Sequence, residues 1–349
     1  MSAFKPAFQI TNAIAGHLTA IERACGFLDA ANISESWIKR MARRALVLEA
    51  HHTTHIEGTQ LTLDQAQRLL NGEPVAGADP DDARELLNYR DAFELVSGYL
   101  GEGGPVTEGL IREIHRRLVQ GVRGGSARPG EYRHVQNLVV NSATGKTVYT
   151  PPPPGDVAPL MRQLVEWLNA PTDIHAVLIS GIAQFQLVHI HPVVDGNGRA
   201  SRLLSTLCLY RSGYDFKRLF TLSEFYDRDR PAFYAAIQGV RENGMDLTGW
   251  LEYFVTGLAT QMDETREHGR RIIKADLTAG EHGLNPRQRD VLLACLDDGG
   301  AGISDLEKLL PQIPRRTLQR DLSILVEMDL LTASGHTNNK RYLLSAKAL

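Results

Sequence analysis

The sequence predicts a mainly helical protein, in which a helical bundle carries one β-hairpin and is followed by a C-terminal module patterned like a winged helix-turn-helix. Apolar side chains recur every three or four positions over most of the chain, which is the period of an amphipathic helix. Residues 134–150 are the only convincing strand material before the C-terminal end. From Asn285 onward the pattern changes to three short helices followed by two short strands.

Composition and charge fit a globular chain of more than one domain. The chain has 349 residues, of which 43% are hydrophobic and 23% charged, and its net charge of −3 gives no general attraction to nucleic acid or membrane. No cationic, apolar leader opens it, and no uncharged apolar run reaches about 18 residues. The three cysteines are far apart, which indicates free thiols in a reducing compartment. We therefore expect a cytoplasmic protein without a membrane anchor.

Four regions are expected along the chain. Residues 1–105 form an N-terminal helical region, which includes a helix over residues 34–58, and residues 106–270 form the core. Residues 271–284 are expected to link this core to the winged helix-turn-helix at residues 285–349. The boundaries follow changes in helix pattern and in the density of charged residues.

Capping residues place several helix starts. Thr62 and Gln65 have the spacing of a capping box, which predicts a short helix to about Leu70. Thr107 and Asp156 are expected to cap two later helices, since short oxygen-bearing side chains satisfy the first amides of a helix.

Twelve consecutive residues concentrate the reactive side chains: His191-Pro-Val-Val-Asp-Gly-Asn-Gly-Arg-Ala-Ser-Arg202. The apolar segments on either side, residues 174–190 and 200–214, predict two helices joined by this string. Gly196-Asn197-Gly198 then lies at the N-terminus of the second helix, where unpaired N–H groups and partial positive charge attract phosphate. The glycines allow a phosphate to approach the backbone closely.

Charged side chains of the same string complete a phosphate-transfer site. Arg199 and Arg202 are three residues apart, so both project from one side of the first turn and can grip phosphate oxygens. Asp195 offers the hard oxygen ligand that suits Mg²⁺ bridging phosphates. His191 can act as a general base toward an attacking hydroxyl. The string therefore predicts nucleotide phosphate transfer.

The string resembles the Fic family signature, H-x-F-x-D/E-G-N-G-R-x-x-R, with Val193 in place of the aromatic residue. The resemblance implies a Fic-type helical bundle and a protein adenylyltransferase, which moves AMP from ATP to a Ser, Thr or Tyr hydroxyl of a target protein or of itself. It implies that His191 is the catalytic base, that Asp195 binds Mg²⁺, and that ATP contacts Gly196, Asn197, Gly198, Arg199, Ala200, Ser201, Arg202 and Tyr234. Gly198 favours AMP transfer, because the related Doc branch, which transfers phosphate, typically has lysine there.

An inhibitory segment is expected at Thr53…Glu57-Gly58. On its own this pattern fits a helix that ends at Gly58 with a solvated glutamate. It also resembles the S/T-x-x-x-E-G/N inhibitory helix of self-regulated Fic proteins, in which the glutamate pairs with the second signature arginine, here Arg202. Such a carboxylate occupies the donors that should hold the γ-phosphate of ATP. The resemblance leaves removal of AMP, with the same glutamate activating water, as a further activity.

The hairpin at residues 134–150 has two interpretations. Its turn-rich centre, residues 141–145, predicts two strands joined by a tight turn, which is sufficient for a purely structural role. It also resembles the Fic flap, whose strand edge holds the modifiable segment of the target over the nucleotide. The segment PGEYR (residues 129–133) and Gln136-Asn137 extend this resemblance.

The C-terminal module leaves its partner open. Arg316, Arg320 and Ser323 share one face of the third helix, as in a helix that reads the major groove of DNA. Residues 285–349 hold nine Lys and Arg against eight Asp and Glu, and strong phosphate binding usually needs a larger excess. DNA contact, protein docking and homodimer formation all remain alternatives.

Rival functions also remain. His189, His191 and Asp195 resemble two imidazoles and a carboxylate around zinc, and His51 with His55 is a further pair, although zinc leaves the glycines and arginines unexplained. A DNA-binding transcriptional regulator in which the Fic domain is a nucleotide sensor is the second alternative. Another nucleotide or a phosphocholine donor is the third, because no residue reads the base.

Overall fold

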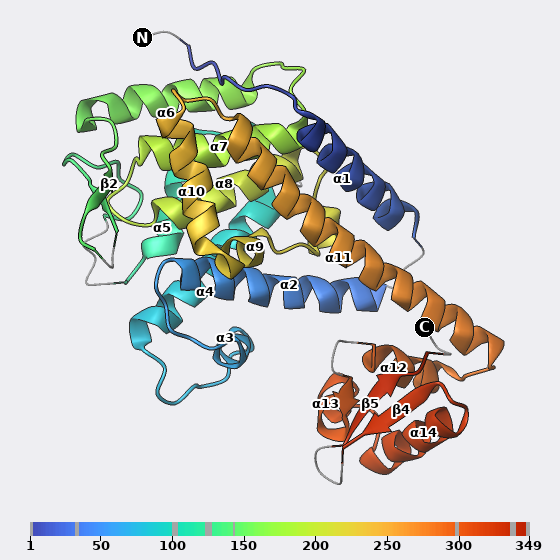
Figure 1. Ribbon diagram of the computed structural model, residues 1–349. Helices are drawn as coiled ribbons and strands as arrows, with labels where there is room; N and C mark the ends of the chain where they lie inside the picture. Colours follow the sequence, from blue (N-terminus) through green and yellow to red (C-terminus); the bar gives the residue numbers. More distant parts are fainter. Residues whose placement is uncertain are drawn as a thin grey trace. The chain divides into compact units, whose positions relative to one another are not determined.

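The computed structural model describes most of the chain as two compact units (Figure 1). The described residues are 3–31, 35–99, 104–122, 128–141, 144–296, 300–335 and 340–346. One unit comprises residues 1–25 and 38–263, and the other comprises residues 26–37 and 264–349. Four predicted features lie partly outside the described residues: the start of the helix over residues 34–58, the loop over residues 123–133, the hairpin tip at residues 141–145 and the turn between the two C-terminal strands.

Helices dominate the larger unit, so the predicted mainly helical class is confirmed. They are α1 (Asn12–Ala30), α2 (Glu35–Ile56), α3 (Leu63–Leu70), α4 (Pro80–Tyr99), α5 (Glu108–Val119), α6 (Pro154–Asn169), α7 (Ala176–Ile190), α8 (Asn197–Arg211), α9 (Leu222–Arg228), α10 (Arg230–Glu242) and α11 (Thr248–Glu281). Residues of α1, α2 and α11 are shared with the second unit.

Helices α7 and α8 form the centre of this unit and pack against each other (Figure 1). Both are buried along most of their length: α7 is apolar on nearly every side, whereas α8 also buries polar side chains, including Arg199, Ser201 and Arg202. Gly181 lets α11 approach α7 closely, because a Cβ at this position would lie 3.0 Å from the side chains of Leu251 and Phe254. Trp250 of α11 donates a hydrogen bond of 2.8 Å to the Gly181 carbonyl. The candidate string thus joins two buried core helices.

The predicted hairpin is present but short. Strands β1 (Val139–Val140) and β2 (Thr147–Tyr149) are antiparallel, with Val139 opposite Tyr149. Residues 151–154 are all proline and cannot donate to a strand ladder, so pairing ends where they begin.

Two of the three expected caps are confirmed. Thr62 and Gln65 form the capping box of α3, and the Thr107 side chain accepts from the Leu110 amide at the start of α5. The Asp156 prediction is wrong: α6 begins at Pro154, because proline lacks the N–H that the first turn leaves unpaired and its φ already suits a helix. Asp156 lies in the first turn, where its charge favours the helix dipole.

The C-terminal residues form a small unit with its own core. Helices α12 (Pro286–Ala294), α13 (Ile303–Leu309) and α14 (Arg315–Glu327) accompany a three-stranded antiparallel sheet in the order β3 (Ala301–Gly302), β5 (Arg341–Leu344), β4 (Leu331–Ser334). Leu306, Leu318 and Leu322 are fully buried at its centre. The short strand β3 was not expected from the sequence. Assignment of this unit as a winged helix-turn-helix stays a prediction.

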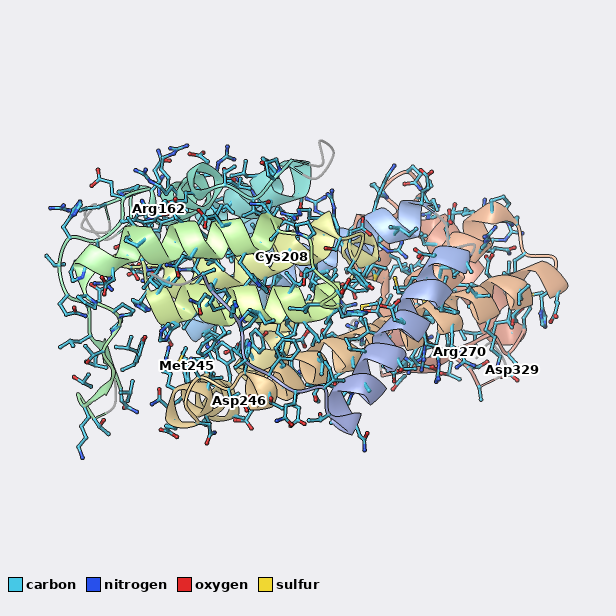
Figure 2. All side chains as sticks on the ribbon, turned by 90° about the horizontal axis from the view of Figure 1, so that it is seen from above. Arg162, Cys208, Met245, Asp246, Arg270 and Asp329 are labelled. Carbon is cyan, nitrogen blue, oxygen red and sulfur yellow. The ribbon has the colours of Figure 1, made fainter. Side chains whose placement is uncertain are left out.

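The described helices include none that combines the length and the apolar content needed to cross a bilayer. The three cysteines are free, as expected. Cys208 lies inside the helical bundle on α8 (Figure 2), where burial raises the pKa of its thiol to about 12 and keeps it unreactive near neutral pH.

Candidate active site

The string from His191 to Arg202 forms the turn between α7 and α8. His191 ends α7 in the left-handed region, with φ of 52°. Gly196 precedes α8 with φ of 83°, and a Cβ there would lie 3.0 Å from a methyl group of Val119. Both the positive φ and the close contact require glycine at this position. In the first turn of α8, Asn197, Arg199 and Ala200 are buried, and Gly198 is partly exposed.

Asparagine side chains brace this turn from inside. Asn197, only 3% exposed, accepts a hydrogen bond of 3.1 Å from the Val193 amide and donates one of 2.8 Å to the Val193 carbonyl. Asn137 from the hairpin donates to the same carbonyl at 2.9 Å. Val193 itself is buried. Both ends of the Asn197 side-chain amide are therefore bonded within the loop.

The predicted base has the protonation that its role needs. Nδ1 of His191 lies 3.3 Å from the Val188 carbonyl, which only accepts, so Nδ1 carries the proton and Nε2 keeps its lone pair. The pKa of His191 is lowered to about 4, chiefly by burial; the positive charges of Arg133 and Arg241 also lower it, whereas the Val188 bond and Glu57 act in the opposite direction. The imidazole is therefore neutral near pH 7 and able to accept a proton.

Arg202 is paired with the end of α2. Its Nη2 donates to Oε1 of Glu57 at 2.6 Å and to the Thr53 carbonyl at 3.0 Å, and its Nε donates to Oγ1 of Thr53 at 2.7 Å. Gly58, with φ of 112°, turns the chain away directly afterwards. A Cβ on Gly198 would overlap Oε1 of Glu57. The carboxylate thus lies over the N-terminus of α8, at the position where the sequence predicts a phosphate.

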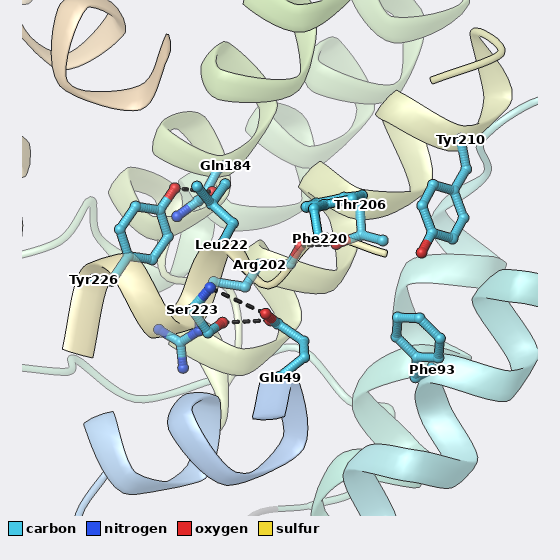
Figure 3. Close-up of a pocket in the computed structure, with 10 residues that line it drawn as sticks. All are labelled: Glu49, Phe93, Gln184, Arg202, Thr206, Tyr210, Phe220, Leu222, Ser223 and Tyr226. Atoms are coloured by element: carbon cyan, nitrogen blue, oxygen red, sulfur yellow. Dashed lines mark hydrogen bonds between the residues drawn. The ribbon is translucent and has the colours of Figure 1, made fainter. Parts of the chain in front are cut away.

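A small cavity lies behind Arg202 (Figure 3). On its wall, Glu49 accepts hydrogen bonds from the Ser223 amide at 3.0 Å, from the Ser223 hydroxyl and from the Tyr89 hydroxyl at 3.2 Å. These donors satisfy the Glu49 carboxylate. The ion pair of Arg202 is formed with Glu57 instead.

Arg199 points elsewhere. Its Nη1 donates to Oε2 of Glu85 on α4 at 2.7 Å, and both side chains are 1% exposed. Its Nη2 lies 3.6 Å from Oδ2 of Asp195. The two arginines thus pair with different glutamates, and Arg199 supplies the counter-charge that the buried Glu85 needs. A contact between Arg199 and ATP stays a prediction.

Asp195 offers the carboxylate best suited to a metal. Its Oδ1 accepts from the Gly196 amide at 2.7 Å, and its side chain is 38% exposed. His115 supports it from behind: the Gly130 amide donates to Nδ1 of His115, so Nε2 carries the proton and donates to the Asp195 carbonyl at 3.0 Å. One accessible carboxylate fits Mg²⁺ that takes its other ligands from phosphates and water.

The described residues contain no group of three His, Cys, Asp or Glu side chains that could hold a metal, so the zinc alternative gains no support. Nδ1 of His189 lies 2.9 Å from the Tyr149 hydroxyl, and Nδ1 of His55 lies 2.8 Å from Oδ2 of Asp227. Both histidines thus belong to networks between helices or between a helix and the hairpin.

The remaining predicted residues contribute unequally. Tyr234 is 50% exposed on α10, and the pKa of its hydroxyl is raised by burial and by Glu57. Ala200 and Ser201 are both buried in the protein interior, and the Ser201 hydroxyl donates to the Gly198 carbonyl at 2.7 Å. The sequence did not single out four residues that contact or surround the site: Glu85, His115, Arg133 and Arg241. Of these, only Arg133 had a signal in the sequence, as the last residue of PGEYR (residues 129–133).

Residues 105–209 match the model of the Fic/DOC family, and residues 21–97 match that of the Fic/DOC family N-terminal region. Among curated proteins, the chain is 33% identical over 200 residues to the protein adenylyltransferase Fic of Drosophila willistoni, covering 56% of this chain and 38% of that one. It is 35% identical over 190 residues to the Drosophila ananassae protein of the same name, covering 54% and 36%. The chain thus spans less than two fifths of the length of these relatives.

Solved structures agree on the fold. A Fic family protein from Desulfovibrio desulfuricans G20 superposes with a TM-score of 0.67 at 22% identity, over 98% of this chain and 99% of that chain. Residues 134–508 of Fic-1 from C. elegans superpose with a TM-score of 0.59 at 25% identity, covering 72% and 70%. With the two family matches, which together span about half of the chain, and a signature placed between two core helices, the chain belongs to the Fic/DOC family.

Proposed function

We propose that this protein is an adenylyltransferase that moves AMP from ATP to a Ser, Thr or Tyr hydroxyl of a target protein or of itself, and that Glu57 restrains it. The observation that carries the proposal is the Glu57 carboxylate bonded to Arg202 above Gly198. A negative side chain at a helix N-terminus stands where a phosphate would bind. The curated relatives, named as protein adenylyltransferases, support the same chemistry.

The N-terminus of α8 is the proposed phosphate site. Its backbone N–H groups and partial positive charge favour the phosphates of ATP, and Gly196 and Gly198 leave room for them. Arg202 would bind the outer phosphates once Glu57 leaves. Asp195 would hold Mg²⁺, which neutralises phosphate charge when bound. Tyr234, at the exposed rim near Glu57, is the proposed contact for the rest of the nucleotide.

His191 is the proposed general base. Its neutral imidazole takes the proton of the target hydroxyl as the hydroxyl oxygen forms a bond to the α-phosphorus. The bond from the α-phosphorus to the bridging oxygen breaks, and pyrophosphate leaves with that oxygen. Arg202 stabilises the charge that develops on the leaving group. General-base catalysis contributes about 10²–10⁴-fold, so His191→Ala should lose at least that much activity.

The proposed restraint is competition for Arg202. While Glu57 and Thr53 occupy its donors, the γ-phosphate lacks its partner and ATP binds weakly or unproductively. Removing Glu57 should therefore raise AMP transfer. Hydrolytic removal of AMP, with Glu57 activating water, is the reverse activity that the same geometry permits.

Labelling with two forms of ATP tests the proposal. Wild type, Glu57→Gly, and Glu57→Gly with His191→Ala are incubated in lysate with ATP that carries the label at either the α- or the γ-phosphate. We expect protein-bound label from the α-form alone, strongest in Glu57→Gly and lost with His191→Ala. Label from the γ-form would indicate phosphate transfer instead. Absence of protein-bound label from both forms would remove the enzyme proposal.

The C-terminal unit supports a second candidate, a DNA-binding regulator in which the Fic domain senses a nucleotide. Arg316, Arg320 and Ser323 are exposed on α14, opposite the buried leucines of that helix. Fluorescence anisotropy with duplex DNA at increasing salt tests this alternative. Binding that weakens steeply with salt and is lost in Arg316→Ala with Arg320→Ala would favour it over protein docking or homodimer formation.

A further inference from the structure

Arg133, which lies between α5 and the hairpin, is a buried arginine whose hydrogen bonds end on backbone carbonyls. It is 1% exposed. Within the described part of the chain, its guanidinium donates to the carbonyls of His191 at 2.8 Å, Val135 at 3.0 Å, Ile190 at 3.4 Å and Pro152. Its own amide donates to the Pro192 carbonyl at 2.9 Å. Burial lowers the pKa of Arg133, as expected for a charge taken out of water.

Two of these carbonyls belong to the C-terminal end of α7. Carbonyl groups in the last turn of a helix have no partner within the helix, and the helix dipole makes this end negative. Arg133 satisfies the carbonyls of Ile190 and His191 and places positive charge where the dipole favours it. It therefore caps α7 directly at the predicted base.

The backbone of His191 needs such a support. Its φ of 52° is unusual for a residue with a side chain, and a left-handed conformation persists only where surrounding contacts hold it. Arg133 binds the carbonyl of His191 through its side chain and the carbonyl of Pro192 through its amide. These two bonds fix the peptide units that follow Cα of His191, and with them the direction of its imidazole.

The same guanidinium also joins both ends of the hairpin. Val135 lies before β1, and Pro152 lies after β2. The Tyr149 hydroxyl adds a second connection, because it donates to the His189 carbonyl at 2.8 Å. The hairpin and the turn at His191 are therefore tied to one another at both strands, through Arg133 on one side and Tyr149 on the other.

We propose that Arg133 is a positioning residue for the transfer reaction, holding His191 in its left-handed turn and in a set relation to the base of the hairpin. The inference rests on the proposed function, since it concerns the reaction for which His191 is the base. The five hydrogen bonds of Arg133 reach the carbonyls of Val135, Pro152, Ile190, His191 and Pro192, all outside the N-terminus of α8. Arg133 therefore acts on the base and not on phosphate binding. The charged groups that face His191 are Arg133, Arg241 and Glu57.

The test compares Arg133→Met and Arg133→Lys, each in the Glu57→Gly background. A displacement of about 1 Å at a reacting group can lower a rate by roughly 10²-fold, so we expect Arg133→Met to lower kcat by about that factor with KM for ATP unchanged. Removing a positive charge also raises the pKa of His191, so the acid limb of the kcat profile should move to higher pH. Lysine keeps the charge but cannot reach all the carbonyls, so kcat should fall while the acid limb stays.

Arg211→Gln in the same background is the matched control. Arg211 at the end of α8 also donates to a backbone carbonyl, that of Leu168 at 2.9 Å, but it lies outside the proposed machinery. We expect its kcat and acid limb to equal those of the parent. A kcat for Arg133→Met within threefold of the parent, in protein shown by circular dichroism to be folded, would overturn the positioning role. So would a loss that appears mainly in KM for ATP.

A readout without catalysis separates this inference from the proposed function. If Glu57→Gly transfers no AMP, the proposed function fails, and NMR titration of the His191 imidazole, assigned with His191→Asn, still tests Arg133. The pKa of His191 should rise in Arg133→Met and stay in Arg133→Lys. Equal titration in the parent and both variants would show that Arg133 does not act on His191. Should Arg133→Met not fold, Arg133→Lys still tests the positioning role, because kcat should fall in this variant while the acid limb stays.

Discussion

Glu57→Gln tests the regulation of the site with the smallest change of shape. The Glu57 carboxylate accepts a hydrogen bond of 2.6 Å from Arg202, whose other bonds reach Thr53. Glutamine keeps the length of the side chain and removes its negative charge. The guanidinium then retains a polar neighbour but loses its ion pair, so an incoming phosphate meets a weaker competitor.

The size of the effect follows from the single hydrogen bond between Glu57 and Arg202. A hydrogen bond to a charged group contributes about 1.5–3 kcal/mol. The Glu57 side chain is 26% exposed, so water replaces part of what is lost, and the lower end, about 1.5 kcal/mol, applies. Since about 1.4 kcal/mol is a tenfold change in an equilibrium constant, ATP should bind Glu57→Gln roughly tenfold more tightly than wild type. Glu57→Gly, which also empties the space over Gly198, should bind ATP more tightly still.

Isothermal titration calorimetry with ATP and Mg²⁺ measures these dissociation constants. Glu73→Gln serves as the control, because Glu73 pairs with Arg68 at the surface and its loss should leave ATP affinity unchanged. Equal affinity for ATP in wild type, Glu57→Gln and Glu57→Gly would refute the reasoning that Glu57 competes with phosphate for Arg202.

Three further predictions concern stability. Gly196→Ala should lower the free energy of unfolding by about 1–3 kcal/mol, because alanine is strained at a φ of 83° and its Cβ meets Val119, and urea unfolding measures this loss. Glu85→Gln should cost about 3–5 kcal/mol by removing the buried carboxylate that pairs with Arg199 at 2.7 Å and leaving only Asp195 at 3.6 Å; adding Arg199→Met should restore much of this loss, whereas an equally unstable double variant would contradict the ion-pair argument. Burial lowers the pKa of His189 from 6.5 to about 4, so its neutral form stabilises the fold above pH 6.5 and this contribution is lost as pH falls toward 4. His189→Asn should therefore weaken the dependence of the free energy of unfolding on pH between these values. An unchanged slope would exclude His189 as a contributor.

The location of the candidate site and the helical class could be predicted from the sequence alone. The string from His191 to Arg202 and the apolar periods around it involve residues close together in the chain, where spacing determines which face of a helix a side chain occupies. The capping box at Thr62 was predictable for the same reason, since a cap depends on a few adjacent residues. The pairing of Glu57 with Arg202, now present at 2.6 Å, was expected only from a family resemblance and not from spacing.

Tertiary structure alone decided which distant groups meet. Arg199 and Arg202 have the same residue type and lie three positions apart, yet one pairs with Glu85 of α4 and the other with Glu57 after α2. Arg133 binds carbonyls that every residue possesses, so no pattern of side chains could reveal its partners. Periodicity specifies a face of a helix, whereas the groups opposite that face depend on how the helices pack, and at this site the packing sets a different glutamate against each arginine.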